Sequence, residues 1–189
     1  FFGGDFGDFR LLPEIRLYGE LMRGVVLATR VSAGFLLPYN YKTRFPQPLT
    51  TSGPGESQFA DERQHDNGAP PIWRAFFSGG ANSNRGYPVR AIGLRDCTDD
   101  AQGNREVGAN CSIFVGGASM WEGSIELRFD IVGELSGVLF LDDSDVSRRT
   151  LDLRLDYPHL ATGPGLRYQT PVGPVRVDFG WRIPGAQSF

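Results

Sequence analysis

Residues 174–183 carry the feature that most restricts the fold, a strict alternation of apolar and polar side chains. The apolar positions are Val175, Val177, Phe179, Trp181 and Ile183, and the positions between them are Arg176, Asp178, Gly180 and Arg182. Because successive side chains of a β-strand point to opposite faces, a strand with this sequence has one apolar face and one charged face. We therefore predict a strand whose two faces meet different surroundings.

The same period of two recurs in five other segments, so we predict an all-β chain. The predicted strands are residues 10–21, 25–37, 120–131, 135–142, 159–170 and 174–183. In the third of these, Ile125 and Leu127 share the apolar face, whereas Glu126 lies on the opposite, polar face. We expect the six strands to be consecutive and antiparallel.

The connections between these strands alternate in length. Short turns of residues 22–24, 132–134 and 171–174 alternate with two long connections, residues 38–117 and 143–158. A soluble β-sandwich also has alternating strands, but a connection as long as 38–117 is unusual in a compact soluble domain. Short turns on one side and long loops on the other are typical of outer-membrane β-barrels, in which the short turns are periplasmic and the long loops extracellular.

We therefore predict an antiparallel transmembrane β-barrel whose apolar face contacts lipid. The side chains expected to face lipid are Ile125, Leu127, Val175, Val177, Phe179 and Trp181. Six strands are too few to close such a barrel, because single-chain outer-membrane barrels begin near eight strands. An open edge in lipid would leave unpaired backbone groups, each costing several kcal/mol. We expect either a fragment of a larger barrel or a barrel that other chains complete.

Composition excludes several other classes of protein. No stretch approaches the roughly 20 apolar residues of a membrane-spanning helix, and the net charge of −3 argues against nucleic-acid binding. His65 and His159 are far apart in sequence, and no nucleophile elbow, phosphate loop or metal-spaced cluster is present. We therefore expect no enzyme activity, no cofactor and no metal site. Residues 1–4 have no signal-peptide features, so we expect the chain to begin within a longer protein.

Cys97 and Cys111 lie in one polar stretch of the long connection. Two unpaired thiols are possible there, but free thiols have little packing reason to occupy a polar loop. We therefore predict a disulfide outside the membrane, in an oxidising compartment. Closing a loop of about 15 residues would stabilise the fold by roughly 3 kcal/mol in the chain-entropy model.

Intact-mass spectrometry with thiol alkylation tests this disulfide. We expect native protein to resist alkylation and to accept two alkyl groups only after reduction. Alkylation of both thiols in native, unreduced protein would show that the cysteines are unpaired.

Residues 76–87 form the most specific motif of the chain. An aromatic residue precedes Gly79 and Gly80, and the run continues to Arg85, Gly86 and Tyr87. This motif resembles the signature loop of the BamA/TamA family of outer-membrane assembly proteins (the bacterial surface antigen family), in which an aromatic-x-Gly-Gly run precedes Arg-Gly-Phe/Tyr. The family usually has valine before the arginine, where this chain has Asn84.

Other segments match the family in the same order along the chain. Residues 123–129 resemble its next strand, residues 140–142 resemble the Phe-x-Asp of the following strand, and residues 163–176 resemble its penultimate hairpin. Ser144 stands where the family usually has glycine. The resemblance covers roughly residues 10–183 of the chain.

The resemblance implies a sixteen-stranded barrel preceded by periplasmic POTRA domains. Residues 1–189 would then be a partial barrel domain that supplies about the tenth to fifteenth strands, with the connection 38–117 as an extracellular loop folded into the lumen. We expect the final strand to be absent, because residues 184–189 do not alternate.

The resemblance also implies a site at the tip of that loop. Glu126 lies opposite Ile125 and Leu127, and Asp142 lies opposite Leu141, so both carboxylates are expected on the inner, polar face. The planar fork of arginine can pair with two carboxylates at once. We therefore expect Arg85 to reach Glu126, Asp142 or both inside the barrel; an incidental arginine in an exposed turn is the alternative.

The function that the resemblance implies is the folding and insertion of other β-barrels, by strand addition at a lateral seam between the first and last strands. The expected partners are unfolded outer-membrane proteins, accessory assembly lipoproteins or periplasmic chaperones, and outer-membrane lipid and lipopolysaccharide. Three alternatives remain: a polypeptide-translocating pore of the TamA-like or two-partner secretion type, a barrel that anchors an attached enzyme domain, and a passive porin.

Overall fold

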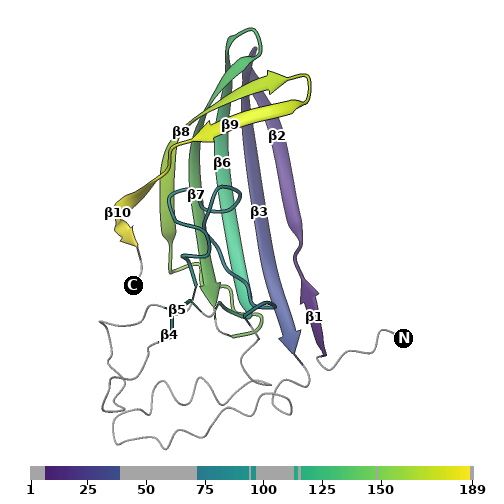
Figure 1. The fold of residues 1–189 in the computed structure, drawn as a ribbon, viewed down its shortest axis with the longest axis vertical. Helices are drawn as coiled ribbons and strands as arrows, with labels where there is room; N and C mark the ends of the chain where they lie inside the picture. The colour runs from purple at the N-terminus through teal and green to yellow at the C-terminus, as the bar shows by residue number, and fades with distance from the viewer. Residues whose placement is uncertain are drawn as a thin grey trace, which may run out of the picture.

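The computed structural model describes residues 7–38, 72–93, 95–96, 113–114, 116–147 and 149–187, and these residues form strands, turns and loops (Figure 1). The strands are β1 (Asp8–Leu11), β2 (Glu14–Met22), β3 (Val25–Pro38), β4 (Arg95–Asp96), β5 (Ile113–Phe114), β6 (Ser119–Val132), β7 (Leu135–Ser147), β8 (His159–Thr170), β9 (Gly173–Asp178) and β10 (Trp181–Gln187). Within those ranges, no helix is long and apolar enough to cross a membrane.

The main sheet is antiparallel and follows the order of the chain. β1 and β2 both pair with β3, then come β6, β7 and β8, and β9 and β10 both pair with β8. The eight strands therefore run as six consecutive antiparallel segments, which confirms the predicted all-β fold. The register places Glu126 opposite Phe140 and Ser124 opposite Asp142 on β6 and β7.

The polarity of the two faces of this sheet is the reverse of that in a soluble protein. On one face, apolar side chains are exposed, among them Ile125, Val175, Val177, Phe179 and Trp181, and Leu127 on the same face is half-buried. On the other face, polar side chains are buried, among them Glu122, Ser124, Glu126, Asp142 and Ser144. Soluble monomers rarely expose so continuous an apolar surface. An apolar exterior with a polar interior is the arrangement of an outer-membrane barrel wall, as the alternation predicted.

Three predicted strand boundaries were wrong. The segment predicted as 10–21 is interrupted between β1 and β2 at Leu12 and Pro13, and proline has no N–H to give to a ladder. The segment predicted as 135–142 continues to the end of β7 at Ser147. The segment predicted as 174–183 is broken at Phe179 and Gly180, and β10 extends to Gln187, into the stretch predicted to be non-strand.

The extension of β7 has a clear physical reason. Residues 144–147 are all buried, because the loop that follows folds back on this end of the strand. Arg154 donates to Asp145 at 2.9 Å, and Ser147 donates to Asp152 at 2.6 Å. With both faces of the strand covered, the sequence there has no reason to alternate between apolar and polar residues.

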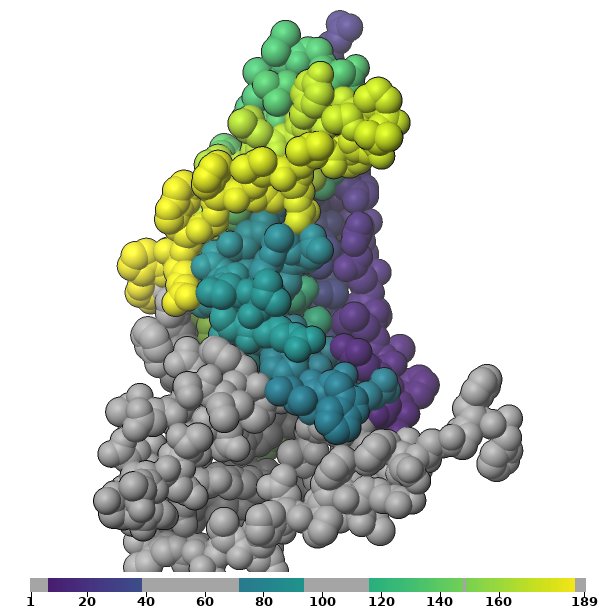
Figure 2. Space-filling view, in the orientation of Figure 1, coloured from purple at the N-terminus to yellow at the C-terminus, as the bar shows by residue number. Residues whose placement is uncertain are grey.

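Loop residues 72–93 lie against the polar, inner face of the sheet (Figures 1 and 2). Phe76 exchanges two backbone hydrogen bonds with Gly117, just before β6. The loop also contacts strands at both edges of the sheet. Arg74 pairs with Asp8 on β1, and Arg176 on β9 donates to Asn82 at 2.7 Å. The sheet therefore curls around the loop as half of a barrel.

An apolar cluster joins the loop to the end of the sheet near β4 and β5. The cluster comprises Leu36, Phe76, Tyr87, Ile92, Ala118, Met120, Val146 and Ala161. Its members come from the loop and from β3, β6, β7 and β8, so burying them ties these elements together. The loop is thus packed as part of the fold, with its tip directed along the inner face.

Candidate functional site

Arg85 lies at the tip of the loop and contacts the carboxylates of two neighbouring strands. Its Nε and Nη2 donate to the two oxygens of Asp142, each at 2.7 Å, and its Nη1 donates to Glu126 Oε1 at 2.7 Å. The backbone N–H of Arg85 also donates to Asp142 Oδ2 at 3.1 Å. The side chain of Arg85 is 6% exposed, so this is a buried, bidentate ion pair extended to a second carboxylate.

The sheet register explains why the two carboxylates converge. Glu126 and Asp142 occupy inward positions of adjacent strands, and the residue opposite Asp142 is Ser124. Ser124 Oγ donates to Asp142 Oδ1 at 2.7 Å and lies 3.2 Å from Arg85 Nη2. The structure thus brings together the three charged residues that the sequence placed at one site.

A third carboxylate, Asp178, belongs to this site, and the sequence analysis did not select it. Asp178 Oδ2 lies 3.5 Å from Arg85 Nη1 and 3.4 Å from Arg176 Nε. Both carboxylate oxygens are buried and accept no hydrogen bond from any described residue. The alternation of residues 174–183 placed Asp178 on the polar face, so its inward direction was visible in the sequence although its partner was not.

The surroundings of Arg85 favour its charged form. Its guanidinium carbon lies 3.6 Å from the ring centroid of Phe140, a cation–π contact. Burial by itself lowers the pKa of Arg85, but the hydrogen bonds to Asp142 and the charges of Asp142 and Glu126 outweigh burial and raise the pKa above its ordinary value. Arginine is protonated in proteins in any case, so Arg85 is the positive charge of this site.

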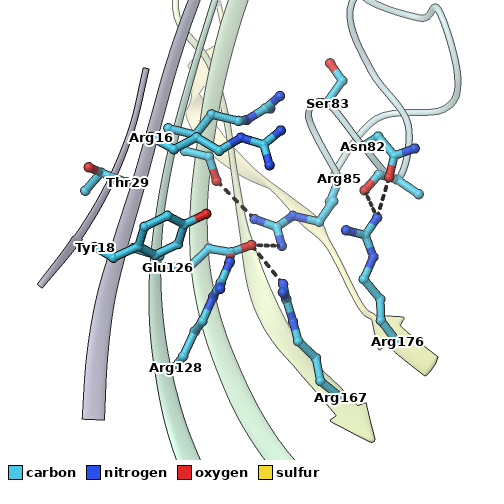
Figure 3. Close-up of a pocket in the computed structure, with 14 residues that line it drawn as sticks. Arg16, Tyr18, Thr29, Asn82, Ser83, Arg85, Glu126, Arg128, Arg167 and Arg176 are labelled. Atoms are coloured by element: carbon cyan, nitrogen blue, oxygen red, sulfur yellow. Dashed lines mark hydrogen bonds and ion pairs between the residues drawn. The ribbon is translucent and has the colours of Figure 1, made fainter. Parts of the chain in front are cut away.

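Glu126 is shared among several arginines (Figure 3). Besides Arg85, it accepts hydrogen bonds from Arg128 at 2.6 and 2.8 Å and from Arg167 at 3.0 Å. The site is therefore a network of positively and negatively charged side chains that extends from the loop across β6 and β8. Removing one charged side chain would leave its former partners as buried charges without a counter-ion, which is energetically costly.

Gly79 and Gly80 allow the loop to turn towards Arg85. Both have φ of 103°, a region that side-chain-bearing residues rarely adopt. The turn is held by Gly80 N–H, which lies 3.1 Å from the carbonyl oxygen of Asn84 and 3.0 Å from that of Tyr87. The hydroxyls of Ser78 and Ser83 both donate to Glu122 on β6.

The backbone at Arg85 and Gly86 fits into the break between β9 and β10. A Cβ atom on Gly180 would lie 2.6 Å from the carbonyl carbon of Arg85 and 2.9 Å from the backbone nitrogen of Gly86. A Cβ atom on Gly86 would lie 3.2 Å from the carbonyl carbon of Trp181 and would overlap Ala161. These two glycines allow loop and strand backbones to touch, and the interrupted strand accommodates the loop.

The residues flanking this pair complete the site. The ring of Tyr87 packs edge-on against His159, with centroids 5.7 Å apart, and beneath Arg182 at 4.5 Å. Asn84 is buried, and its Nδ2 donates to Ser144 Oγ at 3.1 Å and to the carbonyl oxygen of His159 at 2.5 Å. Asn84 and Ser144, which the motif comparison gave as departures from the BamA/TamA pattern, contact each other.

The predicted disulfide lies outside the described residues. Cys97 directly follows β4, and Cys111 is two residues before β5, which pairs with β4. The disulfide stays a prediction. Among the residues that the structure describes, no group of three or more His, Cys, Asp or Glu side chains is arranged to hold a metal ion.

Comparisons with known proteins agree with this fold. Residues 1–188 match the Omp85 superfamily domain. The fold is similar to that of BamA from Haemophilus ducreyi in a crystal structure lacking POTRA domains 1–3, with a TM-score of 0.69 and 16% sequence identity. That match covers 100% of this chain and 34% of that chain, so this chain spans about a third of its length. The chain belongs to the Omp85 superfamily, and it is a β-barrel segment of the bacterial outer membrane.

Proposed function

We propose that this chain is part of an assembly factor that folds and inserts β-barrel proteins into the outer membrane. Family membership and the BamA-like fold support this class of protein. The observation that carries the proposal is the attachment of the loop tip to the inner face, where Arg85 meets carboxylates on β6, on β7 and at the end of β9. A loop bound in this way joins several strands into one rigid wall.

A rigid wall is useful to a barrel that must open elsewhere. In an insertion factor, incoming strands add to a free sheet edge through backbone hydrogen bonds, and lipid burial completes their folding. We infer that the Arg85 site keeps β6–β10 fixed while a seam outside these strands opens. In this proposal residues 1–189 supply about the tenth to fifteenth strands of a sixteen-stranded barrel, with the connection 38–117 folded into the lumen.

The partners follow from the same proposal. The substrates are unfolded outer-membrane proteins, delivered by periplasmic chaperones or by accessory assembly lipoproteins. The apolar outer face contacts membrane lipid and lipopolysaccharide. The proposal requires no cofactor and no covalent chemistry, because strand pairing and lipid burial drive the insertion.

Reconstitution of the full-length gene product in lipid vesicles tests the function. An unfolded outer-membrane barrel protein is added outside the vesicles, and its folding is followed by its heat-modifiable mobility on electrophoresis. We expect folding to be faster than in empty vesicles and in vesicles that hold an unrelated porin. Folding at the rate of empty vesicles would contradict the proposal.

The same vesicles distinguish the alternative of a polypeptide-translocating pore. An unfolded secreted polypeptide is added outside, and its protection from external protease is measured. Protection of that polypeptide, without faster folding of the barrel client, would assign the chain to translocation.

A further inference from the structure

A second feature of the inner face is a cavity of about 470 Å³ below the loop tip (Figure 3). Arginines dominate its described lining, and they come from successive elements around the curled sheet. They are Arg16 on β2, Arg30 on β3, Arg128 on β6, Arg167 on β8, Arg176 on β9 and Arg85 on the loop. Glu126 is the sole carboxylate in that described lining.

The carboxylates that balance these arginines lie mostly outside the cavity lining. Arg16 donates to Glu14 at 2.5 Å, and Arg30 lies 3.4 Å from Glu122. Glu126 already accepts hydrogen bonds from three arginines. The cavity surface therefore presents guanidinium groups, with the opposite charges placed beside or behind them.

Two arginines of this lining each have a guanidinium nitrogen that donates to no described residue. Arg128 uses Nε and Nη2 on Glu126, and its Nη1 hydrogen-bonds to no described residue. Arg167 uses Nη2 on Glu126, whereas its buried Nε has no described partner. The side chains of Arg16, Arg128 and Arg167 are 57%, 35% and 19% exposed, so an acceptor-rich ligand in the cavity can reach their guanidinium groups.

The cavity suits a compact, multiply charged anion better than a peptide. Its lining is mainly charged and polar, without the apolar pockets that peptide side chains occupy. The lining side chains lie on the inner face of the sheet, whereas an extended peptide adds at the backbone edge of a strand. A phosphate monoester carries about −1.5 to −2 charge and three acceptor oxygens, which match the planar forks of several arginines.

We propose that this cavity binds a ligand bearing phosphate monoester groups, with Arg16, Arg128 and Arg167 as its main contacts. The ligand could be a soluble phosphate compound or a phosphorylated lipid headgroup, since the recognised chemistry is the same. This site goes beyond the proposed assembly role and does not depend on it.

Titration calorimetry on the full-length protein in detergent tests the site, with fructose 1,6-bisphosphate, which carries two phosphate monoester groups, as the soluble probe at constant ionic strength. We expect saturable binding to the wild-type protein. Arg16→Gln and Arg128→Gln should each raise the Kd about tenfold, because each removes charge-assisted hydrogen bonds. Arg23→Gln is the matched control, because Arg23 lies in the exposed turn after β2, and its Kd should equal that of the wild type.

Further arms identify the source of the ligand and guard against misfolded variants. Phosphatidic acid in the micelles, compared with phosphatidylcholine, tests a lipid-borne phosphate. Whichever of the soluble probe and phosphatidic acid has the lower Kd identifies the source of the ligand. Arg16→Lys keeps the charge without the fork and should give an intermediate Kd. Heat-modifiable mobility establishes that each variant is folded before titration.

Three results would overturn this assignment. The first is that neither phosphate probe binds saturably. The second is that binding is unchanged in both the Arg16 and Arg128 variants. The third is that hexaglutamate binds more tightly than either phosphate probe, which would assign the cavity to acidic peptide.

Discussion

Replacing Arg85 with alanine is expected to release the loop from the inner face and to slow client insertion at least about tenfold. The variant would leave Asp142 and Glu126 buried without their shared cation, at a cost of roughly 3–5 kcal/mol. Asp142→Ala should have a similar effect, because it leaves the Arg85 guanidinium without its bidentate partner. The strands should persist in both variants, since the ladder hydrogen bonds are made by the backbone and do not involve the side chains of Arg85 and Asp142.

The double variant Arg85→Ala/Asp142→Ala makes this prediction specific to the pair. If the two side chains act through each other, the double variant should be little worse than either single variant in the vesicle folding assay. Arg85→Lys should fall between wild type and alanine, because lysine keeps the charge and loses the fork. Arg23→Ala in the exposed turn should match the wild type. Additive effects of the two single variants would show that the pair does not act as a unit.

Gly180→Ala is expected to undock the loop tip even though it removes no polar contact. The added methyl would meet the backbone of Arg85 and Gly86, which cannot retreat without breaking the hydrogen bonds of Arg85. Overpacking of this kind typically costs about 1–3 kcal/mol. Undocking would expose the peptide bond after Arg85, which trypsin cleaves when that bond is accessible.

Limited trypsin digestion followed by mass spectrometry measures this effect directly. The peptide that ends at Arg85 should appear much earlier in the Gly180→Ala variant than in the wild type. Gly19→Ala is the control, because Gly19 lies in β2 and a Cβ there would meet nothing within 4 Å. If trypsin cleaved the peptide bond after Arg85 equally slowly in Gly180→Ala and in the wild type, the break between β9 and β10 would tolerate a side chain at position 180.

The sheet and two of the three carboxylates of the Arg85 site were predictable because alternation assigns every strand residue to a face. Glu126 and Asp142 fall on the inner face by parity, and the family motif named their partner. Asp178 falls on the same face by the same rule. Its contact with Arg85 depends on how far the sheet curls, which no single strand encodes.

The interruptions of the strands were not predictable in the same way. Gly180 occupies a polar-face position of an otherwise regular pattern, so its sequence context looks like continuous strand. Its role depends on Gly86, far away in the chain, whose backbone fills the break. The end of β7 escaped prediction for a related reason, because burial of residues 144–147 by a distant loop removes the alternation on which strand prediction rests.

The hydrogen bond between Asn84 and Ser144 bears on how such loops can be exchanged between relatives. Valine has no side-chain hydrogen-bond donor. A grafted loop with valine at position 84 would therefore lose the hydrogen bonds that Asn84 Nδ2 donates to the Ser144 hydroxyl and to the His159 carbonyl oxygen. Glycine at 144, the usual residue in the family that the motif resembles, would remove one of these two unpaired groups, the Ser144 hydroxyl. We expect the two sites to be epistatic: chimaeras that swap one of them should fail where those that swap both succeed.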